Sequence, residues 1–192
     1  MRSDAACVAR PLLAFAVLLA APAGADVVER ILAVLDGQPV LASDVRVLEV
    51  VRGLGPADAL EATLDERLMF REAGRVPQAA VSAEEEERTL ARLLEERSDL
   101  RTAVAEPELR RLVRRQASIV KYVDFRFRPQ VRVTPEEVKK AYDAEYAGKE
   151  EAPAFAAVSP AIEEKLARQA LDERVEAWVK ELRAAAEIRY NR

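Results

Sequence analysis

Strand-forming patterns occur in this sequence only near its two ends, and this placement constrains the fold more than any other feature. Near the start, apolar runs flank Asp36-Gly37, a pair that favours the tight turn of a β-hairpin because both central positions need positive φ. Near the end, residues 187–190 alternate polar and apolar side chains with the period of a strand. A lone strand of about five residues is unstable without partners. We therefore expect residues near Ile188 to pair with residues near Leu32, which would close one domain from both ends.

Between these ends the sequence is typical of helices. It is rich in Ala, Leu, Glu and Arg, with 5% aromatic residues and 6 glycines in 192 residues. Ser82 with Glu85, and Thr134 followed by Pro135, are start signals for helices. The expected helices begin at Ser43-Asp44 and then cover 57–73, 82–98, 107–127, 134–146 and 159–185. The expected fold class is mainly α, with a small β-sheet formed by the N-terminal hairpin and the C-terminal strand.

The first 25 residues have the three-part pattern of a secretory signal peptide. Arg2 and Arg10 mark the basic region, residues 12–21 are apolar, and residues 23–25 are the small side chains of a cleavage site. An uncleaved membrane anchor is the less favoured alternative, because the apolar run is short for a bilayer. We expect cleavage after Ala25 and export, to the periplasm in a Gram-negative bacterium, with no stable membrane insertion afterwards.

The remaining residues, 26–192, are expected to form a single domain. Its N-terminal part covers 26–146, and its C-terminal helix and strand cover 159–192. The segment 147–158 between them contains Pro153 and several alanines without a periodic pattern, so we expect a flexible joint there. Trp178, in the middle of the longest expected helix, is expected in the core.

The composition excludes several classes of function. The chain has no histidine, which removes Ser-His-Asp triads, Cys-His dyads and His-ligated zinc. Its single cysteine, Cys7, lies in the expected signal peptide, so disulfides within the chain and Cys-cluster metal sites are also excluded. A net charge of −4 argues against nucleic-acid binding. We expect no catalytic residue, no metal site and no cofactor, and the residues alone indicate a helical binding module.

Two charge clusters each allow two interpretations. The acidic run 84–87 is either the first turn of a helix, which favours carboxylates, or an acidic site. The arginines of the expected helix 107–127 are either a site for phosphate or lipid headgroups, or a solvated face that pairs with nearby glutamates. For the acidic run we favour the first turn of a helix, and for the arginines we favour a solvated face that pairs with glutamates. The basic cluster consists of Arg110, Arg111, Arg114 and Arg115.

The order of these segments resembles a known family. Residues 31–45 (ILAVLDGQPVLASDV) are similar to the opening of SurA-type periplasmic chaperones, which is a strand, a turn and a capped helix. Residues 64–69 resemble the second helix of that family, and residues 131–138 resemble the segment before its parvulin isomerase domain. Residues 178–189 resemble its closing helix and strand. The likeness covers most of the chain after the signal peptide.

The resemblance implies a chaperone core without its isomerase. In the family, a parvulin-type prolyl isomerase domain commonly lies where this chain has only the segment 147–158, and parvulin sites use histidine. The family's core binds unfolded outer-membrane proteins. The resemblance therefore implies a non-enzymatic, ATP-independent holdase whose partners are unfolded polypeptides, outer-membrane proteins among them. A non-catalytic envelope adaptor that binds one folded partner remains an alternative, and a prolyl isomerase is the less favoured one.

A holdase needs apolar surface that stays accessible, supplied by adaptable side chains such as methionine and aromatic residues. The side chains nearest the expected joint, Tyr146 and Phe155, are the strongest candidates, and core packing is the alternative for each. Phe125 meets the same criteria of side-chain type. The candidate client-binding residues are Met69, Phe70, Phe127, Tyr142, Tyr146 and Phe155.

Overall fold

The computed structural model describes residues 29–147, 149 and 151–191. The expected signal peptide lies outside the described residues. In chain order the elements are β1 (Ile31–Leu35), β2 (Gln38–Leu41), α1 (Ala42–Arg52), α2 (Pro56–Ala73), α3 (Ala83–Glu96), α4 (Leu100–Ala103), α5 (Glu106–Arg126), α6 (Pro135–Tyr146), α7 (Phe155–Ala185) and β3 (Ile188–Tyr190). Short 3-10 turns cover Pro77–Ala79 and Arg128–Gln130. The fold is mainly α with a small sheet, as the sequence predicts.

The two ends of the domain meet in an antiparallel sheet of order β2-β1-β3. Asp36 and Gly37 form the turn of the hairpin with φ of 46° and 80°. β3 pairs with residues 33–35 of β1, close to the expected partner Leu32. Pro39 lies in β2, at an edge of the sheet, where a residue without a backbone N–H is tolerated. The predicted closure of the domain is therefore confirmed.

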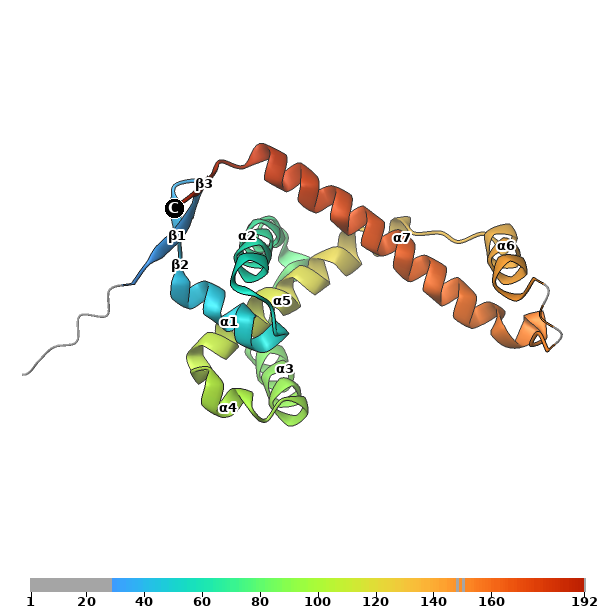
Figure 1. Ribbon diagram of the computed structural model, residues 1–192, viewed down its shortest axis with the longest axis horizontal. Coiled ribbons are helices and arrows are strands. Elements are labelled where there is room, and N and C mark those ends of the chain that lie inside the picture. Colours follow the sequence, from blue (N-terminus) through green and yellow to red (C-terminus); the bar gives the residue numbers. More distant parts are fainter. Residues whose placement is uncertain (1–28, 148, 150, 192) are drawn as a thin grey trace, which may run out of the picture.

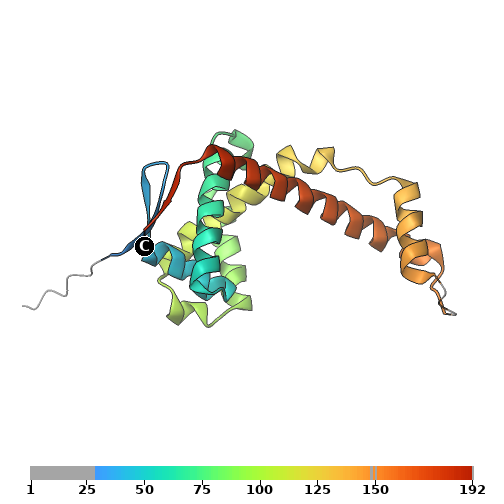
Figure 2. The same cartoon turned by 45° about the horizontal axis from the view of Figure 1, so that its top comes forward.

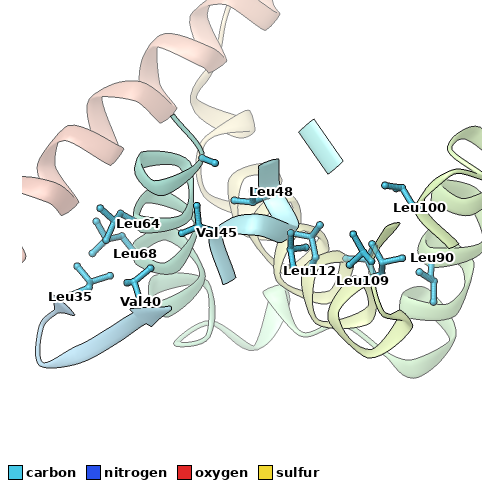
Figure 3. Packing of buried hydrophobic residues seen from close by; sticks show 14 of the residues in the cluster. Leu35, Val40, Val45, Leu48, Leu64, Leu68, Leu90, Leu100, Leu109 and Leu112 are labelled. Atoms are coloured by element: carbon cyan, nitrogen blue, oxygen red, sulfur yellow. The ribbon is translucent and has the colours of Figure 1, made fainter. Parts of the chain in front are cut away.

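Helices α1 to α5 and the sheet form the body of the molecule around one large core. Leucine and valine side chains from β2, α1, α2, α3 and α5 meet there (Figure 3). Leu48, Leu64 and Leu112 are fully buried. Leu182, Ala186 and Ile188, from the end of the chain, pack against this cluster and attach α7 and β3 to it.

Helix α7 passes from the sheet along the body and continues beyond it, where α6 packs on it (Figures 1 and 2). We call α6 and the N-terminal half of α7 the arm. A second cluster fixes α7 to the body: the rings of Tyr122, Phe127 and Trp178 lie together with Ala73 and Ala79. We call these three rings the root cluster. Trp178 is buried there, as the sequence predicts.

The helix boundaries follow their capping residues in most places. The Ser82 hydroxyl accepts from the Glu85 N–H while the Glu85 carboxylate accepts from the Ser82 N–H, which is the expected capping box of α3. Thr134 and Glu137 do the same for α6. Gly53 ends α1 with φ of 65°, a conformation that few other residues adopt.

The start of α1 differs from its prediction. The helix begins at Ala42, so Ser43 and Asp44 lie inside its first turn and do not precede it. The Asp44 carboxylate reaches back and accepts a hydrogen bond from the Leu41 N–H at 3.1 Å. Asp44 therefore satisfies the helix start from the third position, a role that the pattern of residue types alone does not distinguish from capping.

The expected joint 147–158 is shorter than predicted. Helix α7 begins at Phe155 and contains Pro160, which was expected near the helix start. Pro160 lies in the second turn, where the missing N–H removes one backbone bond, and packing against α6 outweighs this loss. Residues 128–130, between α5 and α6, form a 3-10 turn, and residues 131–134 that follow it are extended.

Candidate functional site

The structure separates the six candidate residues into two groups and one single residue. Tyr142, Tyr146 and Phe155 come together at the outer end of the arm, and we call them the tip cluster. Phe127 belongs to the root cluster, and Met69 packs against it. Phe70 lines a groove of about 360 Å³ beside the turn that follows α2.

The tip cluster is held by contacts between α6 and the start of α7. The ring centroids of Tyr142 and Tyr146 are 5.0 Å apart, and those of Tyr142 and Phe155 are 5.3 Å apart at an angle of 83°. The Tyr142 hydroxyl donates to the Pro153 carbonyl at 2.7 Å, which fixes the connection between the two helices. Val138 and Ile162 are buried in α6 and α7. The tip is therefore an ordered aromatic surface outside the body's core.

Lysine side chains surround the rings of the tip cluster. The Lys139 Nζ lies 5.4 Å from the ring centroid of Tyr142 and 5.9 Å from that of Phe155. The Lys149 Nζ lies 5.0 Å from the ring centroid of Tyr146. Loss of contact with water raises the pKa of the Tyr146 hydroxyl, and the neighbouring Glu145 carboxylate raises it further. Lys139 also pairs with the Asp143 carboxylate, and Lys165 lies 3.5 Å from the Glu145 carboxylate, so the site combines uncharged aromatic faces with a rim of paired charges.

Accessibility differs sharply among the candidates. Phe155 is 37% exposed and the two tyrosines are half-buried, whereas Phe127 is only 9% exposed. The Phe127 ring packs against Trp178 at 5.3 Å and meets Tyr122 edge-on at 6.2 Å. Phe127 therefore helps to attach α7 to the body, in agreement with core packing, the alternative to client binding for this residue. Phe125 is exposed on α5 and has no aromatic neighbour within the part of the chain that the structure describes.

The acidic run begins α3 and arginines of α5 pair with it, as the favoured alternative predicts for each cluster. Glu86 is buried and its carboxylate lies 2.6 Å from the Arg114 Nε. Arg110 pairs with Glu87 at 2.7 Å and with Glu106 at 2.9 Å. These arginines hold α3 to α5, so the basic face carries structural ion pairs.

A third basic residue of this face, Arg115, reaches a buried acid on α2. Its Nε lies 2.5 Å from the carboxylate of Glu66, a side chain that is only 3% exposed. Gln116 donates to the other carboxylate oxygen at 3.3 Å. Glu66 was not singled out from the sequence, because its only signal is an acidic residue on the apolar side of a helix.

Metal binding and membrane spanning have no support in the described residues. No three His, Cys, Asp or Glu side chains of residues 29–147, 149 and 151–191 gather as ligands for a metal ion. None of the helices within these ranges has the length and apolar character needed to cross a membrane.

Sequence reasoning found the rings of the tip but missed their polar partners. Lys139 precedes Tyr142 by three positions on one helix, a spacing that places both side chains on the same face and could have identified it. The Pro153 carbonyl carries no such signal, because a backbone acceptor is revealed only by the fold.

Comparison with known proteins adds no relative. No family model matches the chain, and no curated protein matches it. The interpretation of the tip cluster accordingly depends on its geometry and on the residues themselves.

Proposed function

We propose that this protein is an ATP-independent chaperone of the exported compartment, the periplasm in a Gram-negative bacterium, that holds unfolded polypeptides. The observation that carries the proposal is the tip cluster: three aromatic rings gathered at the outer end of an arm, with Phe155 37% exposed. Rings placed there add nothing to the core of the body. Their position is useful if their faces contact another chain.

The chemistry of the tip suits unfolded clients. Unfolded chains expose aromatic and aliphatic side chains, and an aromatic pair contributes about 1 kcal/mol beyond the area it buries. The charged groups of the rim keep the surface hydrated, and Lys149, beside the Tyr146 ring, also attracts client aromatic rings and carboxylates. Several weak contacts of this kind bind many sequences without selecting one, as a holdase requires. The strands of outer-membrane proteins, with their alternating apolar residues, are clients of this type.

The test is suppression of aggregation, followed by light scattering when a urea-unfolded outer-membrane barrel protein is diluted into buffer. We expect the chain without its signal peptide to suppress scattering in proportion to its concentration. The double variant Phe155→Ala/Tyr146→Ala should lose most of this activity. The matched control is Phe125→Ala, which removes an exposed ring from the body and should retain the activity.

Equal loss in the double variant and in Phe125→Ala would mean that any exposed ring contributes, and the tip proposal would be wrong. No suppression by the unmodified chain would favour the adaptor alternative, in which the arm binds one folded partner. Circular dichroism of each variant, compared with the parent chain, separates a lost contact from a lost fold.

We also propose that the protein is not an enzyme. Prolyl isomerisation at a parvulin-type site needs histidine, and the sequence has none. A protease-coupled assay with a proline peptide should give the uncatalysed rate at every protein concentration. Acceleration that rises with protein concentration and survives further purification would contradict this part of the proposal.

A further inference from the structure

A groove of about 580 Å³ runs between α3 and α5, on the body and away from the tip cluster. One wall is a single face of α3, because its residues recur every three to four positions, and the other wall is a face of α5. Val81, just before α3, lies at one end. The groove is lined by Glu85, Arg88, Thr89 and Arg92 on α3 and by Gln116, Ala117, Val120 and Lys121 on α5, and Ala117 and Val120 form its apolar floor.

The floor of this groove is apolar and open. Val120 is 57% exposed, the largest exposed fraction among the large hydrophobic residues of the described chain. Ala117 lies one turn earlier on the same face of α5, and Val81 extends the apolar strip toward α3. An open apolar strip between two parallel rows of side chains has the shape that receives a third helix.

The rim of the groove carries positive charge that the described residues do not neutralise. Arg88 and Arg92 are exposed, and no carboxylate among the residues that the structure describes lies within 4.0 Å of either guanidinium. The one acid of the groove, Glu85, is already engaged by Lys121 at 2.9 Å and by the Ser82 N–H at 2.8 Å. Three basic side chains and one acidic side chain thus line a groove on a chain whose net charge is −4.

We propose that this groove binds an acidic amphipathic helix of another polypeptide. The helix would place aliphatic side chains against Val120 and Ala117, and carboxylates beside Arg88 and Arg92. The wall from Glu85 to Arg92 is about 10 Å long, so about two helical turns of the partner fill it. The site is independent of the tip cluster, and it selects partners by charge as well as by apolar surface.

The test uses two fluorescently labelled helical peptides that share one leucine face. One peptide has glutamates on both flanks of that face and the other has lysines there. Fluorescence anisotropy should report binding of the acidic peptide, with an affinity about ten-fold higher than that of the basic peptide and falling as salt is added. Equal affinities of the two peptides, or no binding of the acidic peptide, would overturn the proposal.

Variants locate the binding on the molecule. Arg88→Glu/Arg92→Glu should weaken binding of the acidic peptide about ten-fold. The control Arg46→Glu/Arg101→Glu changes the net charge by the same amount on α1 and α4, and should leave the affinity nearly unchanged. Val120→Asp tests the floor and should also weaken binding, whereas Phe155→Ala should have no effect. If both double variants weakened binding of the acidic peptide equally, the affinity would depend on the overall charge of the chain, and the proposed groove site would be wrong.

Discussion

Ile188 of β3 lies directly opposite Leu35 of β1, so a residue near the end of the domain is held against one near its start. Backbone bonds on both sides of this pair secure it. The Asp36 N–H donates to the Glu187 carbonyl at 2.8 Å, and the Asn191 N–H donates to the Leu32 carbonyl at 2.9 Å. The pairing attaches the end of α7 to the same core that α1 and α2 build.

Deleting residues 187–192 should therefore destabilise the whole domain. The deletion removes the bonds of β3 and the contact of Ile188 with the core, and it should lower the free energy of unfolding by about 3 kcal/mol. Thermal unfolding followed by Trp178 fluorescence measures the effect. An unchanged midpoint, together with an unchanged emission maximum, would mean that β3 contributes nothing to the closure.

The Glu66–Arg115 pair should be asymmetric in its response to substitution. Arg115→Met leaves the Glu66 carboxylate charged and buried, and should cost about 3 kcal/mol in unfolding free energy. Glu66→Leu should cost less, because Arg115 keeps 26% of its side chain exposed and can turn to water. In the double variant most of the stability should return. Urea unfolding of the two single variants and the double variant forms a double-mutant cycle. If the losses in unfolding free energy were strictly additive, the two side chains would not be coupled, and this prediction would be wrong.

Stability should fall in acid and stay level around neutral pH. The Arg71 side chain lowers the pKa of Asp36, and the Glu187 N–H lowers it further. The Ser82 N–H and Lys121 likewise lower the pKa of Glu85. Such depressed values stabilise the folded chain above the unfolded pKa of about 4, and this contribution is lost as the pH falls through the folded values. Without histidine, no side chain of ordinary pKa titrates between about pH 5.5 and 7.5.

The pH dependence is measured by urea unfolding midpoints between pH 7 and pH 3. Asp36→Asn should make the acid decline shallower, and asparagine tolerates the positive φ of that turn position. Asp172→Asn, at an exposed position on α7, serves as the control and should leave the profile unchanged. If Asp36→Asn leaves the pH dependence of the unfolding midpoint unchanged, Asp36 does not contribute to the loss of stability in acid.

Tyr142→Phe should loosen the arm without affecting the body. The substitution removes the hydroxyl that donates to the Pro153 carbonyl, a bond of about 1 kcal/mol. Amide hydrogen exchange in α6 should accelerate about five-fold, while unfolding monitored at Trp178 keeps its midpoint. Unaltered exchange in α6, or a lower midpoint at Trp178, would contradict the separation of arm and body.

The sequence was most informative where a local rule determines the structure. Asp36-Gly37 specifies the hairpin turn, and Ser82 with Glu85 specifies the start of α3, because these residues act on their own neighbours. The closure by β3 was also predictable, since a lone strand needs a partner and the only other strand patterns belong to the N-terminal hairpin. The burial of Trp178 was predictable from its place in the longest helix, and pairing with nearby glutamates was the favoured of two interpretations of the arginine cluster.

What the sequence did not specify depends on contacts between distant segments. Pro160 indicated a helix start, yet α7 begins at Phe155 because its first turn packs against Tyr142 of α6. Phe127 lies between two arginines in the sequence and Phe155 lies among alanines, yet Phe127 is buried and attaches α7 whereas Phe155 remains exposed. Only the fold shows that Phe127, after α5, packs against Trp178 of α7, while Phe155 lies at the start of α7.

The continuity of α7 has a mechanical consequence. Trp178 and Phe155 belong to one uninterrupted helix, and at 1.5 Å per residue they are about 35 Å apart along its axis. The stacked pair of Tyr122 and Trp178, with ring centroids 5.0 Å apart, lies where this helix leaves the body. A tilt of about 10° there would carry Phe155 through about 6 Å, roughly the width of one side chain. The length of α7 thus amplifies any small change in how its root packs into a large displacement of its far end.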